Sequence, residues 1–309
     1  IGLRADARAL AAAGWAIVTL GLANFALGIP QLLGPQGAWL IYPENPMSGV
    51  LFGIFANRNS TGLFLVICLT LLLHLPALGQ LTHNRLFRTV VAIVLLLAIV
   101  LTQSRSAMAL AILPLASIGL RHRSYLWPFL TGNKARLVVL VGALAVALAA
   151  LFAFGSQSRL DDSLNRFNQG NEARAYIWDD ATYSAQKYWP VGAGMGTFDE
   201  VFQVDESLEN LPGKTAGRAH NDYLEIAIEA GLAGILLMSA WLVLIGWKIA
   251  RNEGRLPPWS SWSGSVIIAA IACQSAIDYP LRSQAMLAVA AYALVVVFHQ
   301  HKIAGKAAA

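Results

Sequence analysis

Long apolar runs that could each cross a lipid bilayer constrain the fold of this chain more than any other feature. A spanning helix needs about 20 mostly apolar residues. The candidates lie at 10–29, 60–78, 88–102, 106–120, 137–155, 224–248, 262–278 and 284–299. Of the 309 residues, 57% are hydrophobic and 13% are charged, whereas soluble domains average about 25% charged. The sequence therefore predicts an all-α, polytopic transmembrane helix bundle with about eight spans, and it excludes an ordinary soluble enzyme.

The first apolar run follows Arg4 and Arg8 and extends to about Leu33. It is too long for the core of a signal peptide and lacks a cleavage signal of small residues, so it predicts a transmembrane helix. The sequence opens at Ile1 without a methionine. We expect residues 1–309 to form a single integral membrane domain of a longer protein, with further helices before it.

The sequence offers little for a metal or a cofactor. Cys68 and Cys273 both lie inside apolar runs, which leaves no disulfide framework and no cysteine-based zinc site. Acidic residues of the region 156–222 come largely in adjacent pairs, and neighbouring side chains on a helix diverge instead of converging on one ion. No metal and no cofactor are predicted.

Lysine and arginine concentrate in alternate connections between the predicted spans. One set of connections, with the two ends of the sequence, holds 13 of the 22 basic residues, and the opposite short connections hold only Arg58, Arg105 and Arg282. Because cytoplasmic loops carry the excess of basic residues, both ends of the sequence are predicted to be cytoplasmic. The net charge of +5 follows from this bias, so no nucleic-acid partner is predicted.

The segment 156–222 is predicted to be one large extracytoplasmic loop. It carries six basic and eleven acidic residues. Apolar residues recur with helical periodicity over about 172–189, which predicts an amphipathic helix, and Pro190 ends it. The glycines at 192, 194 and 196 allow tight turns but do not form a nucleotide-binding motif, since no strand precedes them.

The three basic residues that break the charge bias lie at the outer ends of spans. Arg58, Arg105 and Arg282 each have two possible explanations: they snorkel to lipid headgroups, or together they form an anion site. Arginine suits phosphate because its planar guanidinium donates paired hydrogen bonds and stays charged. Arg105 lies in a minimal turn between two predicted helices, where a charge needs a partner or a wet cavity.

A second polar group lies where the loop re-enters the membrane, from Arg218 to Glu225. His220 precedes the sixth predicted span, and a histidine there has a pKa near the working pH and can act as a base. Asp222 or Glu225 could orient its imidazole. The alternative is that His220 and Asn221 only cap the helix. The side chains of Asn221, Glu225 and Glu229 share one helical face, which should contact protein or water and not lipid.

Four stretches of the chain follow one another in a recognisable order. They are Phe52–Asn59 entering a span, Ser104–Ser106 between two spans, Arg174 and Trp178 followed by Pro190–Phe198 in the long loop, and His220–Leu224 running into Glu229–Gly234. In order, spacing and topology, they resemble the O-antigen ligase and O-antigen polymerase family of bacterial membrane glycosyltransferases. The resemblance covers roughly residues 50–250.

The resemblance implies a reaction at the outer, periplasmic face of the bacterial inner membrane. A glycan carried on undecaprenyl diphosphate is transferred to a hydroxyl acceptor, without a metal or a nucleotide sugar. The acceptor is a lipid A-core sugar in ligases, another lipid-linked repeat unit in polymerases and a protein side chain in some relatives. Membrane lipids are the other expected partner, and the lipid tail of the donor is expected to lie in a groove between spans.

Site roles follow from combining the resemblance with the residues themselves. His220 is the expected base, with Asp222 or Glu225 orienting it. Arg174 and Arg105 are the expected catalytic arginines, and the diphosphate is expected to contact Arg218, Arg58 and Arg282, with Asn59 and Asn221 beside them. Aromatic residues of the loop could stack on sugars or only pack the loop onto the bundle; they are Trp178, Tyr183, Tyr188 and Trp189.

Two other classes of protein remain open. A secondary transporter would also carry polar residues in its spans, although its ionisable groups normally lie near the bilayer midplane on broken helices, often in two related halves. Here the charged residues lie at the ends of spans, and the sequence has no evident internal repeat. A non-catalytic membrane scaffold of the same export pathway would not need a histidine and several arginines at one membrane face.

Overall fold

The structure is a computed structural model of the chain, and it describes residues 6–33, 41, 49–121, 175–207, 217–250 and 259–298. These residues are helical or irregular, with no strand among them, which confirms the all-α class. The helices are α1 (Ala7–Leu33), α2 (Arg58–His74), α3 (Gln80–His83), α4 (Arg85–Leu101), α5 (Arg105–Leu110), α6 (Ile112–Arg121), a helix over 175–187, α10 (Phe198–Asp205), α11 (Asp222–Ala250), α12 (Trp259–Ser275), the 3₁₀-helix η2 (Pro280–Arg282) and α13 (Gln284–Phe298).

Two of the described helices are long and apolar enough to cross a membrane. They are α1 and the part of α11 from Asp222 to Lys248, while α2 and α13 are apolar but shorter. The predicted span at 137–155 lies outside the described residues, and each of the other predicted spans coincides with a helix or a pair of helices. The number of spans therefore stays a prediction.

The predicted span at 106–120 is the one whose shape differs. It divides into α5 and α6, and a turn at Ala111 separates them. Pro114 lies in the first turn of α6. A proline has no N–H to donate to the carbonyl one turn earlier, and its ring clashes with that carbonyl, which explains the break at this point. The polar turn predicted between 102 and 106 is present: α4 ends at Leu101, and Ser104 caps the N-terminus of α5.

The described contacts divide the chain into two compact units. The first comprises residues 1–155, 252–270 and 288–309, and the second comprises 156–251 and 271–287. Helix α12 contributes to both, as does α13. The expectation of a single membrane domain stays a prediction, because this division reflects contacts within the chain and not the position of a membrane.

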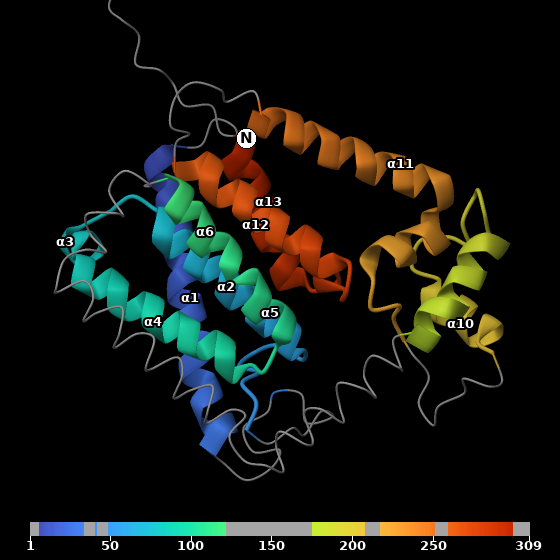
Figure 1. Ribbon diagram of the computed structural model, residues 1–309, viewed down its shortest axis with the longest axis horizontal. Coiled ribbons are helices and arrows are strands. Elements are labelled where there is room, and N and C mark those ends of the chain that lie inside the picture. The colour runs from blue at the N-terminus through green and yellow to red at the C-terminus, as the bar shows by residue number, and fades with distance from the viewer. Residues whose placement is uncertain are drawn as a thin grey trace, which may run out of the picture. The chain divides into compact units, whose positions relative to one another are not determined.

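Helix α2 is the centre of the first unit (Figure 1). All its residues from Ser60 to Leu72 are buried, and α1, α4, α5 and α6 pack against it. A helix that is apolar on every side is stable only where neighbours cover every side. At the C-terminal end of α2, Arg88 donates to the carbonyls of Leu72 and Leu75, at 3.1 and 2.8 Å, and so satisfies carbonyls that lack partners within the helix.

The segment before α2 is fixed by a buried amide of α1. The side-chain oxygen of Gln31 accepts from the backbone N–H groups of Phe52 and Gly53, at 3.2 and 2.8 Å, and its nitrogen donates to the carbonyl of Gly53 at 2.9 Å. Asn24, also on α1, accepts from the N–H of Ile54. These bonds satisfy backbone groups that would otherwise be buried without partners, and they position the entry into α2.

The second unit is built around the N-terminal part of α11. Its apolar core consists of Ala181, Phe198, Phe202, Ala219 and Ile228, all almost completely buried. The amphipathic helix predicted over 172–189 is helical at 175–187, and Ala181 and Ala185 on its apolar face contribute to this core. The loop region between the predicted spans therefore packs onto the start of the next long helix.

Helix α11 is kinked at Gly231, which has φ 55° and ψ −141° (Figure 1). The glycine-rich segment that follows Pro190 docks on this kink through its backbone. Ala193 and Gly194 donate to the carbonyls of Ile228 and Glu229, at 2.8 and 2.9 Å, and Leu232 donates to Pro190 at 2.8 Å. The segment thus pairs with backbone groups that the kink leaves outside the regular helical pattern.

Candidate functional site

The candidate site in the second unit begins just before α11, at Asn221. Its side-chain oxygen accepts from the N–H groups of Tyr223 and Leu224, at 3.0 and 3.2 Å, which is the geometry of an N-cap. Asn221 is therefore the residue that caps α11. His220 precedes the cap with φ 49°, a left-handed conformation that is uncommon outside glycine.

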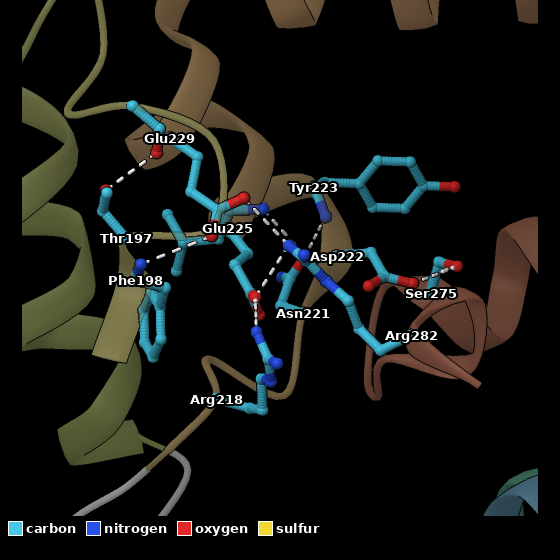
Figure 2. Close-up of polar contacts among 12 residues, drawn as sticks. Thr197, Phe198, Arg218, Asn221, Asp222, Tyr223, Glu225, Glu229, Ser275 and Arg282 are labelled. Carbon is cyan, nitrogen blue, oxygen red and sulfur yellow. Dashed lines mark hydrogen bonds and ion pairs between the residues drawn. The ribbon is translucent and has the colours of Figure 1, made fainter. Parts of the chain in front are cut away.

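Two glutamates of α11 lie one turn apart and are buried. Glu225 is 0% exposed and Glu229 is 1% exposed. Nη2 of Arg282 lies 2.7 Å from Oε1 of Glu225 and 3.0 Å from Oε2 of Glu229, and Nη1 of Arg218 lies 2.8 Å from the same Oε1 of Glu225 (Figure 2). The polar stripe predicted on this face of α11 thus faces protein, and it pairs each buried carboxylate with a guanidinium, as burial of a charge requires.

Arg282 reaches these glutamates from η2, between α12 and α13. Burial alone lowers the pKa of its guanidinium, but the hydrogen bond to Glu229 and the charges of Glu225, Glu229 and Asp222 outweigh it and raise the pKa. Arg282 therefore stays cationic at any physiological pH. Its side chain is 26% exposed and that of Arg218 is 40% exposed, so both side chains remain partly open to water.

Glu229 also connects this ion-pair cluster to the loop region. Its Oε1 accepts from the backbone N–H of Phe198, the first residue of α10, at 3.3 Å (Figure 2). Its backbone carbonyl accepts from Gly194. One residue thus joins the guanidinium of Arg282, the glycine-rich segment and the N-terminus of α10, where a negative charge is favoured by the helix dipole.

The two acids that were expected to orient His220 have other partners. Oδ2 of Asp222 accepts from the hydroxyl of Ser275 on α12 at 2.8 Å (Figure 2), and Glu225 is paired with the two arginines. The carboxylate beside the imidazole is that of Asp278, whose Oδ1 lies 3.4 Å from Nδ1 of His220. Asp278 has no role among the residues predicted from the sequence, because nothing local in the sequence places it near His220.

Arg58, Asn59 and Arg105 belong to the first unit. Arg58 and Arg105 are the first residues of α2 and α5, directly after the caps Asn57 and Ser104. The hydroxyl of Ser104 donates to Oδ1 of Asn59 at 2.8 Å. This bond joins the starts of two helices, each of which opens with an arginine.

The remaining predicted site residues are Arg174 and the aromatic residues of the loop. Arg174 lies outside the described residues. Trp178 donates its indole N–H to the carbonyl of Ala219 at 2.8 Å, so it packs the loop helix onto the segment before α11. Tyr183 and Trp189, by contrast, are 57% and 50% exposed and remain available for stacking. Within the described part of the chain, no group of three His, Cys, Asp or Glu side chains could hold a metal ion.

Part of the chain matches a known protein family. The family model described as O-antigen ligase covers residues 90–239. This range contains Arg105, Arg174, Arg218 and His220, whereas Arg58 and Arg282 lie outside it. No curated protein matches the chain. The family is one of membrane glycosyltransferases that act on lipid-linked glycans in lipopolysaccharide biosynthesis. Residues 90–239 of this chain thus match the O-antigen ligase domain.

Proposed function

We propose that this chain transfers a glycan from undecaprenyl diphosphate to the hydroxyl group of a saccharide acceptor, with His220 as the general base and arginines on the diphosphate. The acceptor is a lipid A-core sugar or another lipid-linked repeat unit. The reaction takes place at the periplasmic face of the bacterial inner membrane, where the positive-inside pattern places the loop 156–222.

One observation carries the proposal: two short segments bring an imidazole and two guanidinium groups into one site. The first segment runs from Arg218 to Glu229 and the second from Ser275 to Arg282. They are joined by the pairs Arg282–Glu225, Ser275–Asp222 and His220–Asp278. A base for an acceptor hydroxyl and cations for a leaving diphosphate are the two requirements of this transfer.

The chemistry follows from these groups. The imidazole of His220 removes the proton of the acceptor hydroxyl as its oxygen attacks the anomeric carbon of the donor glycan. A new carbon–oxygen bond forms, and the bond between the anomeric carbon and the diphosphate oxygen breaks. Negative charge grows on the departing undecaprenyl diphosphate, and fixed guanidinium groups stabilise it. A single displacement of this kind inverts the anomeric configuration.

Arg282 and Arg218 retain N–H donors that can bind the diphosphate. The side-chain contacts of Arg282 run through Nη2 and those of Arg218 through Nη1, within the residues that the structure describes. A guanidinium has five N–H donors, so each retains several. The two glutamates balance the charge of these two arginines, and we propose that Arg174, Arg105 and Arg58 supply the additional positive charge that the diphosphate needs. Asn59 and Asn221 are further proposed contacts of the diphosphate.

The test is sugar transfer by the purified full chain in proteoliposomes that contain undecaprenyl-diphosphate-linked glycans. Transfer is followed on gels for the wild type, His220→Ala and Arg174→Ala. The matched control is His83→Ala, since His83 is an exposed histidine on α3. We expect transfer to disappear in the first two variants, while they stay folded, and to persist in the control.

The products distinguish the acceptors. A ladder of bands indicates a polymerase, and a single shift onto an added lipid A-core acceptor indicates a ligase. Unchanged transfer by His220→Ala would remove the proposed base. The absence of transfer by the wild type, across several glycan donors, would reject the enzyme in favour of a transporter or a scaffold.

A further inference from the structure

We propose that the glycine-rich segment after Pro190 is a membrane anchor: Val191 and Met195 enter the outer leaflet of the membrane beside the kink in α11, and Trp189 lies among the lipid headgroups. The partner of this surface is the lipid itself. The inference requires α11 to span the membrane, but it does not depend on the reaction that the site carries out.

The first support is the exposure of large apolar side chains on this segment. Val191 is 81% exposed, Met195 is 69% exposed and Trp189 is 50% exposed. No charged residue occurs from 188 to 198, between Lys187 and Asp199. Contiguous exposed apolar side chains mark a surface that binds a partner, and tryptophan is enriched where a membrane meets water. The segment therefore has the composition of an interfacial anchor.

The second support is that the segment continues the exposed apolar surface of α11. The N–H of Leu232 donates to the carbonyl of Pro190 at 2.8 Å, and a Cβ on Gly231 would lie 2.7 Å from the backbone carbonyl carbon of Val191. Val191 is therefore level with the kink. Beyond the kink, α11 exposes a series of large apolar side chains, which face lipid in a spanning helix: Leu232, Leu236, Leu237, Trp241, Leu242, Val243, Leu244 and Trp247.

The third support is the length of the uncharged part of α11. The nearest charged residues on either side of it are Glu229 and Lys248. Residues 232–247, after the kink, rise about 24 Å at 1.5 Å per residue, whereas the hydrocarbon core of a bilayer is about 30 Å thick. The span needs the whole of this stretch, so the kink and the segment that docks on it lie at the edge of the hydrocarbon.

The fourth support is that the backbone of the segment has partners within the protein. The N–H groups of Gly192, Ala193 and Gly194 donate to backbone carbonyls at 2.8, 2.8 and 2.9 Å. Irregular backbone at membrane depth needs such partners, since lipid tails offer none. The segment can therefore contact lipid although it is not helical.

This boundary also sets the depth of the ion-pair cluster. Glu229 precedes the kink at Gly231, and Nη2 of Arg282 lies 3.0 Å from its Oε2. The guanidinium of Arg282 therefore lies at the level of the headgroups, where the phosphate groups of lipids are found.

The experiment is electron paramagnetic resonance of nitroxide labels on the full chain in lipid nanodiscs. Val191→Cys and Met195→Cys are labelled one at a time in a Cys273→Ser background, because Cys273 is exposed whereas Cys68 is buried. Each label is relaxed by oxygen, which concentrates in lipid, and by a nickel chelate, which stays in water. The ratio of the two relaxation effects reports whether the label lies in lipid or in water.

Two further labels provide matched references. Leu237→Cys is the lipid reference, since Leu237 is 64% exposed on the apolar part of α11, and Glu200→Cys is the water reference, since Glu200 is exposed on α10. We expect the oxygen-to-nickel ratio at 191 and 195 to resemble that at 237 and to exceed that at 200 several-fold.

Three results would overturn the inference. The first is a ratio at 191 and 195 equal to that at 200, which would place the segment in water. The second is shielding of both labels from oxygen and from nickel, which would indicate a protein partner. The third is a water-exposed label at 237, because α11 would then not span the membrane. None of these measurements requires sugar transfer, so a failure of the proposed function leaves the test intact.

Discussion

Gly192 and Gly231 lie so close together that neither can carry a side chain. A Cβ atom on Gly192 would lie 2.6 Å from the carbonyl oxygen of Glu229 and 2.7 Å from the nitrogen of Gly231, and a Cβ on Gly231 would lie 2.7 Å from the nitrogen of Gly192. Both residues also have positive φ. The docking of the glycine-rich segment on the kink of α11 therefore depends on glycine at both positions.

Replacing either glycine should weaken the second unit. Gly231→Ala adds backbone strain and a steric overlap, and we expect it to lower the free energy of unfolding by about 2–5 kcal/mol. Gly196→Ala is the matched control, because Gly196 has φ 85° but open space around its Cβ position, so only the strain of about 1–2 kcal/mol applies. Thermal unfolding in detergent measures both. Equal losses in the two variants would contradict the close packing.

Removing Arg282 should leave a buried charge without its cation. In Arg282→Gln, Glu225 still pairs with Arg218, but Glu229 loses its guanidinium, and we expect a loss of about 3–5 kcal/mol in unfolding free energy. Arg218→Gln should cost only about 0–1 kcal/mol, since Arg218 is more exposed and Glu225 keeps Arg282. The double variant Arg282→Gln/Glu229→Gln should recover part of the stability in chemical denaturation. No recovery would show that Glu229 does not depend on Arg282.

The entry into α2 should depend on Gln31. Replacing Gln31 with Leu removes three hydrogen bonds to the backbone of Phe52 and Gly53 and leaves their groups buried without partners, at a cost of about 1–3 kcal/mol for each group. Gln80→Leu, an exposed glutamine on α3, should change stability by less than about 0.5 kcal/mol. Thermal unfolding of the two variants in the same detergent makes the comparison, and similar unfolding temperatures would argue against the anchoring role.

Alkaline pH should weaken the contact between the loop helix and α10. Nζ of Lys187 lies 2.5 Å from Oδ1 of Asp205, and this hydrogen bond raises the pKa of Lys187. A raised pKa means that the stabilisation is complete below the ordinary pKa of lysine, near 10.5, and is lost as the pH rises through the higher folded-state value. The stability difference between the wild type and Lys187→Gln should therefore shrink above about pH 10.

Lys187→Arg provides the control for this pH dependence. Arginine keeps its charge throughout this range, so the variant should retain the contact at alkaline pH while the wild type loses it. Unfolding temperatures measured from about pH 8 to about pH 11 test both statements. Parallel curves for the wild type and Lys187→Gln would mean that the ion pair contributes nothing.

Much of the fold follows from local features of the sequence. Apolar runs predicted α1, α2, α4, α11, α12 and α13, because a helix satisfies its own backbone wherever the surroundings are apolar. They did not predict α3 or α10. The polar residues from 102 to 106 marked the turn between α4 and α5. The stripe formed by Glu225 and Glu229 predicted a face of α11 that contacts protein. The division of 106–120 into α5 and α6 was missed, although Pro114 was a visible signal.

The residues of the candidate site were predicted better from the sequence than the contacts between them. The sequence indicated His220, Asn221, Arg218 and Arg282 by their position at the ends of predicted spans, and the structure brings these four into one unit. The sequence did not indicate that Asp278 is the acid beside His220, nor that Glu229 pairs with Arg282. Spacing along one helix predicts which residues share a face, but it does not predict which residues of another helix meet that face.

The sequence by itself determined that this is an all-helical chain with apolar segments of membrane-spanning length and an amphipathic loop helix, since hydropathy and periodicity are properties of neighbouring residues. Only the tertiary structure decided the partners of the charged groups. Asp278, Ser275 and Arg282 come from the region after α12, whereas His220, Asp222 and Glu225 come from the start of α11. Their pairing depends on how residues 271–287 fold against the start of α11 within the second unit, because buried charges and hydroxyls take whichever partner the packing places within hydrogen-bonding distance.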